Sequence, residues 1–180
     1  LQRTTLVNTG DTALLADTLS AAFLTGIGSD GKRRWDDDRF RVHFAYSSWQ
    51  GEGQWRHMSP EDAGLYKTYN HHSQTSVRLR SVGTWSTAKY YPLLLLEDTE
   101  LHRTHFFEVL VGGTGWQIEL CARGHREDST LCVFLGAACE GNDGWTLTLA
   151  PGERYTTCPA LYGCVEGGFE EAVAALTGAK

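Results

Sequence analysis

The stretch between residues 49 and 56 holds the side chains best suited to contact a sugar. Two tryptophans, a carboxylate and an arginine fall within eight residues: Trp49, Glu52, Trp55 and Arg56. Aromatic faces can stack on the C–H groups of a sugar ring, while carboxylate and guanidinium groups hydrogen-bond its hydroxyls. The same four side chains also fit a packed interface with a structural Arg–Glu contact, so both interpretations stay open.

Carboxylates are the second group of candidates, because hydrolysis of a glycosidic bond needs two carboxyl groups about 5–10 Å apart. The sequence offers several acidic residues on or beside expected strands, but no pattern pairs them. We therefore interpret them as solvated carboxylates of strand faces and turns, and we expect no catalytic residue in this chain. The candidates are Glu52, Glu97, Asp98, Glu108 and Glu119.

Metal and cofactor chemistry has little support, and we expect neither a metal nor a cofactor. The run Asp36–Asp38 does not alternate its acids as a calcium loop does, so we interpret it as a solvated loop. His71 and His72 would point to opposite sides of an extended chain and would chelate one metal poorly. Gly112–Gly115 lacks the Lys-Ser/Thr of a phosphate loop and precedes an expected strand. We interpret that stretch as the turn of a hairpin.

The cysteines give no nucleophile and no disulfide framework. No Ser-His-Asp order and no Gly-x-Ser-x-Gly elbow occurs, and the pair Gly163-Cys164 has no evident base. An odd number of cysteines at irregular spacing, without a CxxC pair, predicts reduced side chains that fill core space. Reduced cysteines are typical of the cytoplasm, which is the location we expect. The five are Cys121, Cys132, Cys139, Cys158 and Cys164.

Composition excludes two classes of partner. The 180 residues carry a net charge of -6, and an acidic surface repels phosphate backbones, so nucleic acid is not an expected partner. The most apolar stretch, Tyr91–Leu96, is far too short to cross a bilayer, so no membrane association is expected. The N-terminus also lacks the charged start and apolar block of a signal peptide.

Hydrophobic periodicity predicts many short strands separated by turns. Ser76–Val82 and Trp116–Ala122 alternate apolar and polar residues, and Pro92–Leu96 is an apolar run that fits a strand buried on both faces. Arg39–Trp49 shows a period of two, which predicts a half-buried strand. One face would carry Phe40, Val42, Phe44 and Tyr46, and the other Arg39, Arg41, His43 and Ala45.

The C-terminal segment is the exception, because its apolar residues repeat with helical spacing. After Gly167-Gly168, the positions of Phe169, Val173 and Leu176 follow an i, i+4, i+7 pattern. The expected fold is therefore an all-β antiparallel sandwich spanning residues 1–166, followed by a terminal helix over residues 167–180.

The order of several motifs resembles the N-terminal sandwich domain of family 36 α-galactosidases. Each motif is weak by itself, and their order along nearly the whole chain carries the resemblance. The segments are Leu6–Asp11 with its Asn-Thr-Gly turn, Leu19–Ala22, Phe40–Arg56, Phe106–Glu108, Gly115–Glu119, the turn Leu149–Glu153 with Thr156, Thr157 and Pro159, and Val165–Ala172.

The resemblance implies a supersandwich of the galactose-mutarotase type, of which this chain would be the second half. It implies that the parent protein hydrolyses terminal α-galactosides with retention, using aspartates of a (β/α)8 barrel. No position of this sequence matches those aspartates. The resemblance therefore implies a non-catalytic segment whose terminal helix leads toward an absent barrel, with the rim of the substrate site as its closest approach to sugar.

Half a sandwich would leave open strand edges and apolar surface, so we expect a homo-oligomer. Two other interpretations stay open at this stage. The chain could be a free-standing carbohydrate-binding module that uses Trp49 and Trp55, or a complete enzyme on a β-scaffold. The second of these lacks a catalytic constellation in the sequence.

Overall fold

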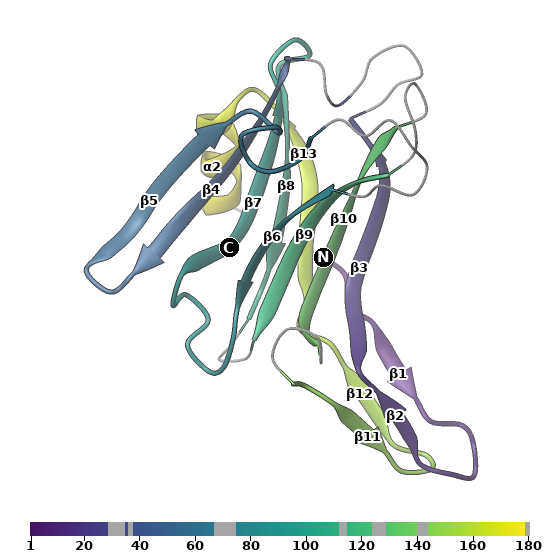
Figure 1. The fold of residues 1–180 in the computed structure, drawn as a ribbon. Coiled ribbons are helices and arrows are strands. Elements are labelled where there is room, and N and C mark those ends of the chain that lie inside the picture. The colour runs from purple at the N-terminus through teal and green to yellow at the C-terminus, as the bar shows by residue number, and fades with distance from the viewer. Residues whose placement is uncertain are drawn as a thin grey trace.

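Two antiparallel sheets face one another, with a small arm at one end and a helix at the C-terminus (Figure 1). This computed structural model describes residues 1–28, 35, 38–66, 75–111, 115–123, 129–139 and 144–178, without the side chains of 137–139. The predicted all-β antiparallel sandwich with a terminal helix is confirmed.

The larger sheet has five strands in the order β13-β8-β7-β4-β5, all antiparallel. Neighbours in sequence are mostly neighbours in the sheet, because β4–β5 and β7–β8 are hairpins. The strands are β4 (Phe40–Ser48), β5 (Gly51–Met58), β7 (Tyr90–Asp98), β8 (Arg103–Val109) and β13 (Ala160–Glu166).

The smaller sheet has four strands in the order β3-β10-β9-β6. It also is antiparallel, with register shifts between β10 and β3 that bend this edge of the sheet. The strands are β3 (Thr18–Ile27), β6 (Thr75–Ser81), β9 (Trp116–Arg123) and β10 (Thr130–Cys139).

The main core lies between the two sheets and follows the predicted period of two. From β4, the four residues predicted on one face all pack into it or against it. β6 and β9 contribute the apolar members of their alternating patterns in the same way. The residues from these two strands are Val77, Leu79, Trp116, Ile118, Leu120 and Ala122.

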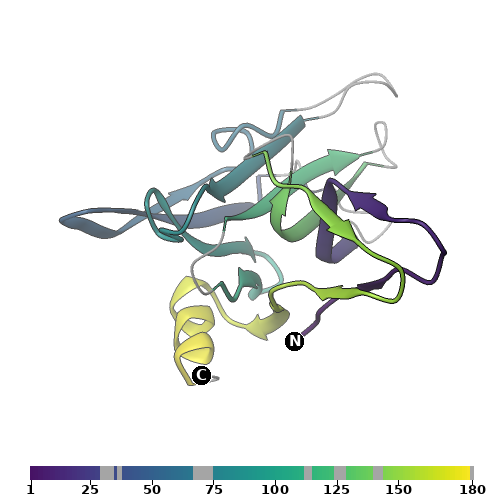
Figure 2. The same cartoon turned by 90° about the horizontal axis from the view of Figure 1, so that it is seen from below.

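The helix α2 (Phe169–Gly178) covers the outer face of the larger sheet, as Figure 2 shows from below. A second apolar cluster forms there around Leu95, Ala172 and Leu176. The prediction that Pro92–Leu96 is buried on both faces therefore holds in β7. The prediction of a half-buried β4 is wrong, because His43 is 3% and Ala45 0% exposed on the helix side.

The interpretation of Gly112–Gly115 as a hairpin turn is also wrong. The strands before and after it, β8 and β9, belong to different sheets, so this connection crosses the sandwich. Residues 112–114 themselves lie outside the described part of the chain, as do Asp36, Asp37, His71 and His72. Asp38 is described and is exposed, as expected of a solvated loop.

Two short ribbons form an arm at one end of the sandwich (Figure 1). In the arm β1 pairs with β12 and β2 pairs with β11, and each strand is three residues long. The strands are β1 (Thr5–Val7), β2 (Leu14–Ala16), β11 (Leu147–Leu149) and β12 (Arg154–Thr156). The two sheets and α2 are called the body below.

The cysteines do not all fill the core as predicted. Cys121 and Cys132 are buried, facing one another across β9 and β10, while Cys158 is partly buried and Cys164 is exposed. The side chain of Cys139 is not described. Among the described helical residues, no segment is long and apolar enough to cross a membrane.

Candidate functional site

The turn of the β4–β5 hairpin presents an exposed pair of tryptophans. β4 ends at Ser48 and β5 begins at Gly51, so Trp49 and Gln50 form the turn, with Gln50 in the left-handed region at φ 59°. Its backbone N–H donates to Glu52 Oε1 at 3.1 Å, which steadies the turn. Trp49 is 74% exposed and meets the ring of Trp85, which is 51% exposed, edge to face at 6.1 Å.

The other two predicted residues point away from one another, because neighbouring residues of a strand face opposite sides. Trp55 lies on the helix side, where its ring meets Phe169 edge to face at 4.8 Å. Arg56 lies on the opposite side, with its guanidinium 5.4 Å from the centre of the Tyr46 ring. The structure therefore places Trp49 and Glu52 near the hairpin tip and does not bring all four predicted residues into one site.

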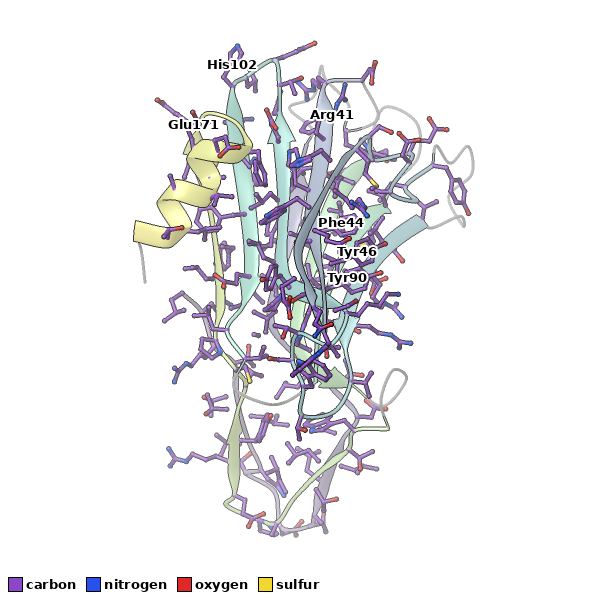
Figure 3. All side chains as sticks on the ribbon, turned by 90° about the vertical axis from the view of Figure 1, so that its left-hand side faces the viewer. Arg41, Phe44, Tyr46, Tyr90, His102 and Glu171 are labelled. Atoms are coloured by element: carbon purple, nitrogen blue, oxygen red, sulfur yellow. The ribbon has the colours of Figure 1, made fainter. Side chains whose placement is uncertain are left out.

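Aromatic rings continue from the hairpin along the sandwich side of the larger sheet. Tyr46 and Tyr90 stack at 5.0 Å, and Phe44 meets both edge to face (Figure 3). Lys89 and Arg56 each hold a cation over one of these tyrosines. We call Trp49, Trp85, Tyr46 and Tyr90 the aromatic surface. Its exposed part, the tryptophan pair, offers flat faces suited to stacking on sugar rings.

The carboxylate candidates are scattered over different surfaces. Glu97 and Asp98 are neighbours on β7 and face opposite sides of the sheet, and Glu119 lies on β9, where it forms an ion pair with Arg78. The interpretation of all five as solvated is wrong for Asp98 and Glu108, which are 1% and 6% exposed. The sequence alone did not indicate that the carboxyl groups of Asp98 and Glu108 are buried.

Of the five candidate carboxylates, only Glu97 and Glu108 lie on the helix side of the larger sheet. Glu97 pairs with Thr104, and Glu108 is four residues further along β8. At about 3.4 Å per residue, the two lie about 14 Å apart along the sheet. That exceeds the separation of either a retaining or an inverting pair. These five carboxylates therefore form no hydrolytic pair.

A chain of hydrogen bonds that the sequence did not predict lies beneath α2. His43 Nδ1 is 2.7 Å from His57 Nδ1, and His43 Nε2 is 2.9 Å from Glu97 Oε2. Burial lowers the pKa of His43, although Glu97 partly opposes this effect. A neutral His43 that donates from Nε2 to Glu97 and accepts from His57 satisfies the whole chain.

These three side chains link three strands to one another and to the helix. They come from β4, β5 and β7, and the ring of Phe169 on α2 lies 4.7 Å from that of His57. The hairpin register, which sets His43 opposite His57, was the signal that could have revealed the pair. The three side chains form a structural connection that contains histidines and can therefore respond to pH. None of the described pockets is lined by His43, His57 or Glu97.

Neither a metal centre nor a cysteine nucleophile emerges from the described residues. Within them, no cluster of three or more His, Cys, Asp or Glu side chains could hold a metal ion. Burial raises the pKa of the Cys164 thiol, which disfavours the reactive thiolate. The neighbouring Gly163 has a packing role, since a Cβ there would lie 2.5 Å from the Phe106 ring.

Comparison with known proteins gives matches at the level of fold. No family model and no curated protein matches the chain. The galactosidase domain of the α-galactosidase–sucrose kinase AgaSK matches 92% of this chain with a TM-score of 0.68 and 18% identity. The glycoside hydrolase family 36 α-galactosidases AgaA and AgaB from Geobacillus stearothermophilus each match 91%, with TM-scores of 0.67 and 0.65 and 14% identity.

The matches establish that this chain has the fold of one part of those enzymes. The chain spans about a fifth of their length: 20% of the AgaSK and AgaA chains and 19% of AgaB. The fold that the motif order suggested is therefore confirmed.

Proposed function

We propose that this chain is a non-catalytic domain of an enzyme that hydrolyses terminal α-galactosides with retention. The reaction itself would take place in a (β/α)8 domain of the same protein. The observation that carries the proposal is the match of 92% of this chain to only 20% of the AgaSK galactosidase domain. The five carboxylate candidates of the sequence support the proposal, because they form no hydrolytic pair with one another and the reaction would need such a pair from another domain.

The face that carries α2 is the proposed contact with the catalytic domain. A hollow of about 210 Å³ opens there beside the helix, and its walls are apolar apart from Thr177. Its lining residues are Trp55, Leu93, Val173, Leu176 and Thr177. On this proposal Trp55 serves a domain interface, whereas Trp49 remains free to approach a sugar.

An activity assay tests the division of labour. The purified 180-residue chain, at high concentration, is expected not to hydrolyse p-nitrophenyl-α-galactoside, whereas the protein encoded by the complete reading frame hydrolyses it. Turnover by the short chain that Glu52→Gln or Asp98→Asn abolishes would contradict the proposal. A reading frame that encodes no barrel beside this chain would contradict it equally.

The exposed tryptophan pair favours a second function, contact with an α-galactoside at the rim of the substrate site or in a free-standing binding module. A galactoside at millimolar concentration is expected to quench tryptophan fluorescence in the unmodified chain. The quenching should disappear in Trp49→Ala and persist in Trp145→Phe, whose ring packs near Tyr155, away from the hairpin. Quenching that survives Trp49→Ala would exclude the hairpin as the sugar contact.

We also propose that the chain forms a homo-oligomer in the cytoplasm. β5 and β6 each end their sheet, and terminal strands can pair with another chain. Exposed apolar side chains of the arm, Val7, Leu14 and Leu15, supply further surface for association. Sedimentation of a monodisperse monomer would contradict this proposal.

A further inference from the structure

The interior of the sandwich changes from apolar to charged at the end where the β7–β8 hairpin turns. Along β7 the interior positions are Leu94 and Leu96, followed by Asp98. Along β8 the alternation that buries Phe107 in the core also turns Arg103 and His105 toward the interior. His102, labelled in Figure 3, marks this end of the molecule, opposite the arm. Charged side chains thus occupy positions where the strand pattern otherwise buries apolar residues.

Arg39 is the most unusual of these charges. The residue precedes β4, is 5% exposed, and holds its guanidinium 4.6 Å from the centre of the Phe40 ring. Its Nη1 lies 3.6 Å from Asp98 Oδ2, an ion pair too long for a hydrogen bond. The buried Nε and Nη1 atoms find no acceptor among the described residues. A buried charged donor without an acceptor is costly, so this geometry favours a further acceptor beyond the described residues.

The Arg39 side chain also borders a cavity of about 150 Å³ between the two sheets. The larger sheet contributes Arg39, Asp98, Arg103 and His105, and β3 of the smaller sheet closes the opposite side at Gly26 to Gly28. Burial lowers the pKa of His105, and Arg103 adds to the effect. At neutral pH the described lining residues therefore supply two guanidinium charges against the single carboxylate of Asp98.

A second described acid, Glu100, also forms an ion pair with Arg39. Glu100 Oε2 is 4.0 Å from Arg39 Nη1, but the Glu100 side chain is 60% exposed. Water therefore screens Glu100 at the rim, whereas Asp98 inside the cavity is 2% exposed. Among the described residues that line the cavity, two guanidinium groups are therefore present with one buried carboxylate.

We propose that this cavity binds an oxyanion, the carboxylate or phosphate group of a small molecule, through Arg39, Arg103 and His105. The planar guanidinium of Arg39 presents Nε–H and an Nη–H side by side, a fork that matches two oxygens of either group. Arg103 neutralises the remaining charge, and a neutral His105 donates one N–H. The site shares no residue with the aromatic surface and does not depend on the α-galactoside proposal.

Titration at constant ionic strength tests the site, with sodium phosphate or sodium acetate replacing sodium chloride. The Nε–Hε signal of Arg39 in ¹⁵N NMR is expected to shift saturably, and the melting temperature to rise with it. Saturation by phosphate alone identifies a phosphate-bearing ligand, and saturation by acetate a carboxylate. If neither anion shifts the signal beyond the chloride control, the cavity holds only water and the proposal fails.

Three variants distinguish a specific anion site from general charge attraction. Arg103 is exposed, so Arg103→Gln should fold, and it is expected to weaken anion binding about tenfold or more. Arg78→Gln is the matched control, because Arg78 pairs with Glu119 on the outer face of the other sheet. An equal loss of affinity in both variants would overturn the proposal. Arg39→Lys keeps the charge but removes the fork, and it should also weaken binding.

Discussion

The body and the arm are both antiparallel β-structure, yet different forces hold them. In the body, strands of seven to ten residues bury their apolar side chains between two sheets, and Leu94, Leu96 and Ile118 are completely buried. In the arm, strands of three residues leave Leu15 67% and Val7 44% exposed. Burial of apolar area therefore accounts for the body but not for the arm.

In the arm, the hydrogen bonds of one side chain provide stabilisation that apolar burial does not provide. Asn8 Nδ2 donates to the carbonyl oxygens of Thr12 at 2.8 Å and Leu149 at 2.9 Å, and Asn8 Oδ1 accepts from the Gly10 N–H at 3.0 Å. The Asn8 backbone also exchanges hydrogen bonds with Gly152 and Glu153. One buried asparagine thus joins the turn after β1 to the turn between β11 and β12. The two regions show that antiparallel β-structure can be stabilised by apolar packing, as in the body, or by the hydrogen bonds of a buried polar side chain, as in the arm.

The largest effect is expected from a cavity in the body. Leu96→Ala removes a fully buried side chain from the middle of β7, and such changes cost about 2–5 kcal/mol. Urea unfolding followed by tryptophan fluorescence should show a lower midpoint with one transition. A loss below about 1 kcal/mol would mean that packing between the sheets does not dominate the stability of the body.

A smaller and local effect is expected in the arm. Asn8→Ala leaves the buried carbonyl group of Leu149 without this donor, a loss of about 1–3 kcal/mol. Hydrogen exchange should accelerate at the Gly10 and Gly152 amides, while amides of β7 keep their protection. Asn8→Asp is the matched control, since it keeps the acceptor for Gly10 but loses both donors. Equal acceleration in β7 would show that the arm and the body unfold together.

Periodicity predicted the body well because each strand there has one face against a single apolar core. The alternation of Phe40 to Tyr46 and of Trp116 to Leu120 identified the faces that the core buries. The terminal helix followed from the spacing of Phe169, Val173 and Leu176, which meet the larger sheet. In these elements local pattern and tertiary environment agree.

What the sequence could not predict depends on contacts between distant segments. The helix buries the second face of β4, so His43 and Ala45 became interior residues despite a pattern typical of a half-buried strand. The crossing from β8 to β9 follows from sheet membership, which a glycine-rich stretch does not encode. The four hairpin candidates were close in sequence, but alternation along β5 sends Trp55 and Arg56 to opposite faces.

Acidification should destabilise the body rather than the arm, because the histidines with lowered pKa values lie in the body. Burial holds the pKa of His43 and His105 below the ordinary value of 6.5, so folding favours their neutral forms. As pH falls below 6.5, the unfolded chain takes up protons that the folded chain excludes, and stability decreases. The urea midpoint is therefore expected to be lower at pH 5.0 than at pH 7.5.

A histidine variant isolates this contribution from that of the acidic residues. In His105→Asn the drop in the urea midpoint between pH 7.5 and pH 5.0 should shrink, because one neutral histidine has been removed from the body. The arm strands contain no histidine. An unchanged pH dependence in His105→Asn would show that the buried imidazole does not contribute to acid sensitivity.

The smallest effect on stability is expected from the exposed apolar side chains of the arm. Leu15→Ser changes a residue that is 67% exposed, so the free energy of unfolding should stay within about 0.5 kcal/mol of the unmodified chain. Its effect should appear instead in association, because the same leucine is available to a second copy. Sedimentation equilibrium is expected to show weaker self-association for Leu15→Ser than for the unmodified chain, with unfolding curves that coincide. If the free energy of unfolding falls and self-association does not change, Leu15 stabilises the fold of its own chain. Apolar packing would then contribute to the arm as well as to the body.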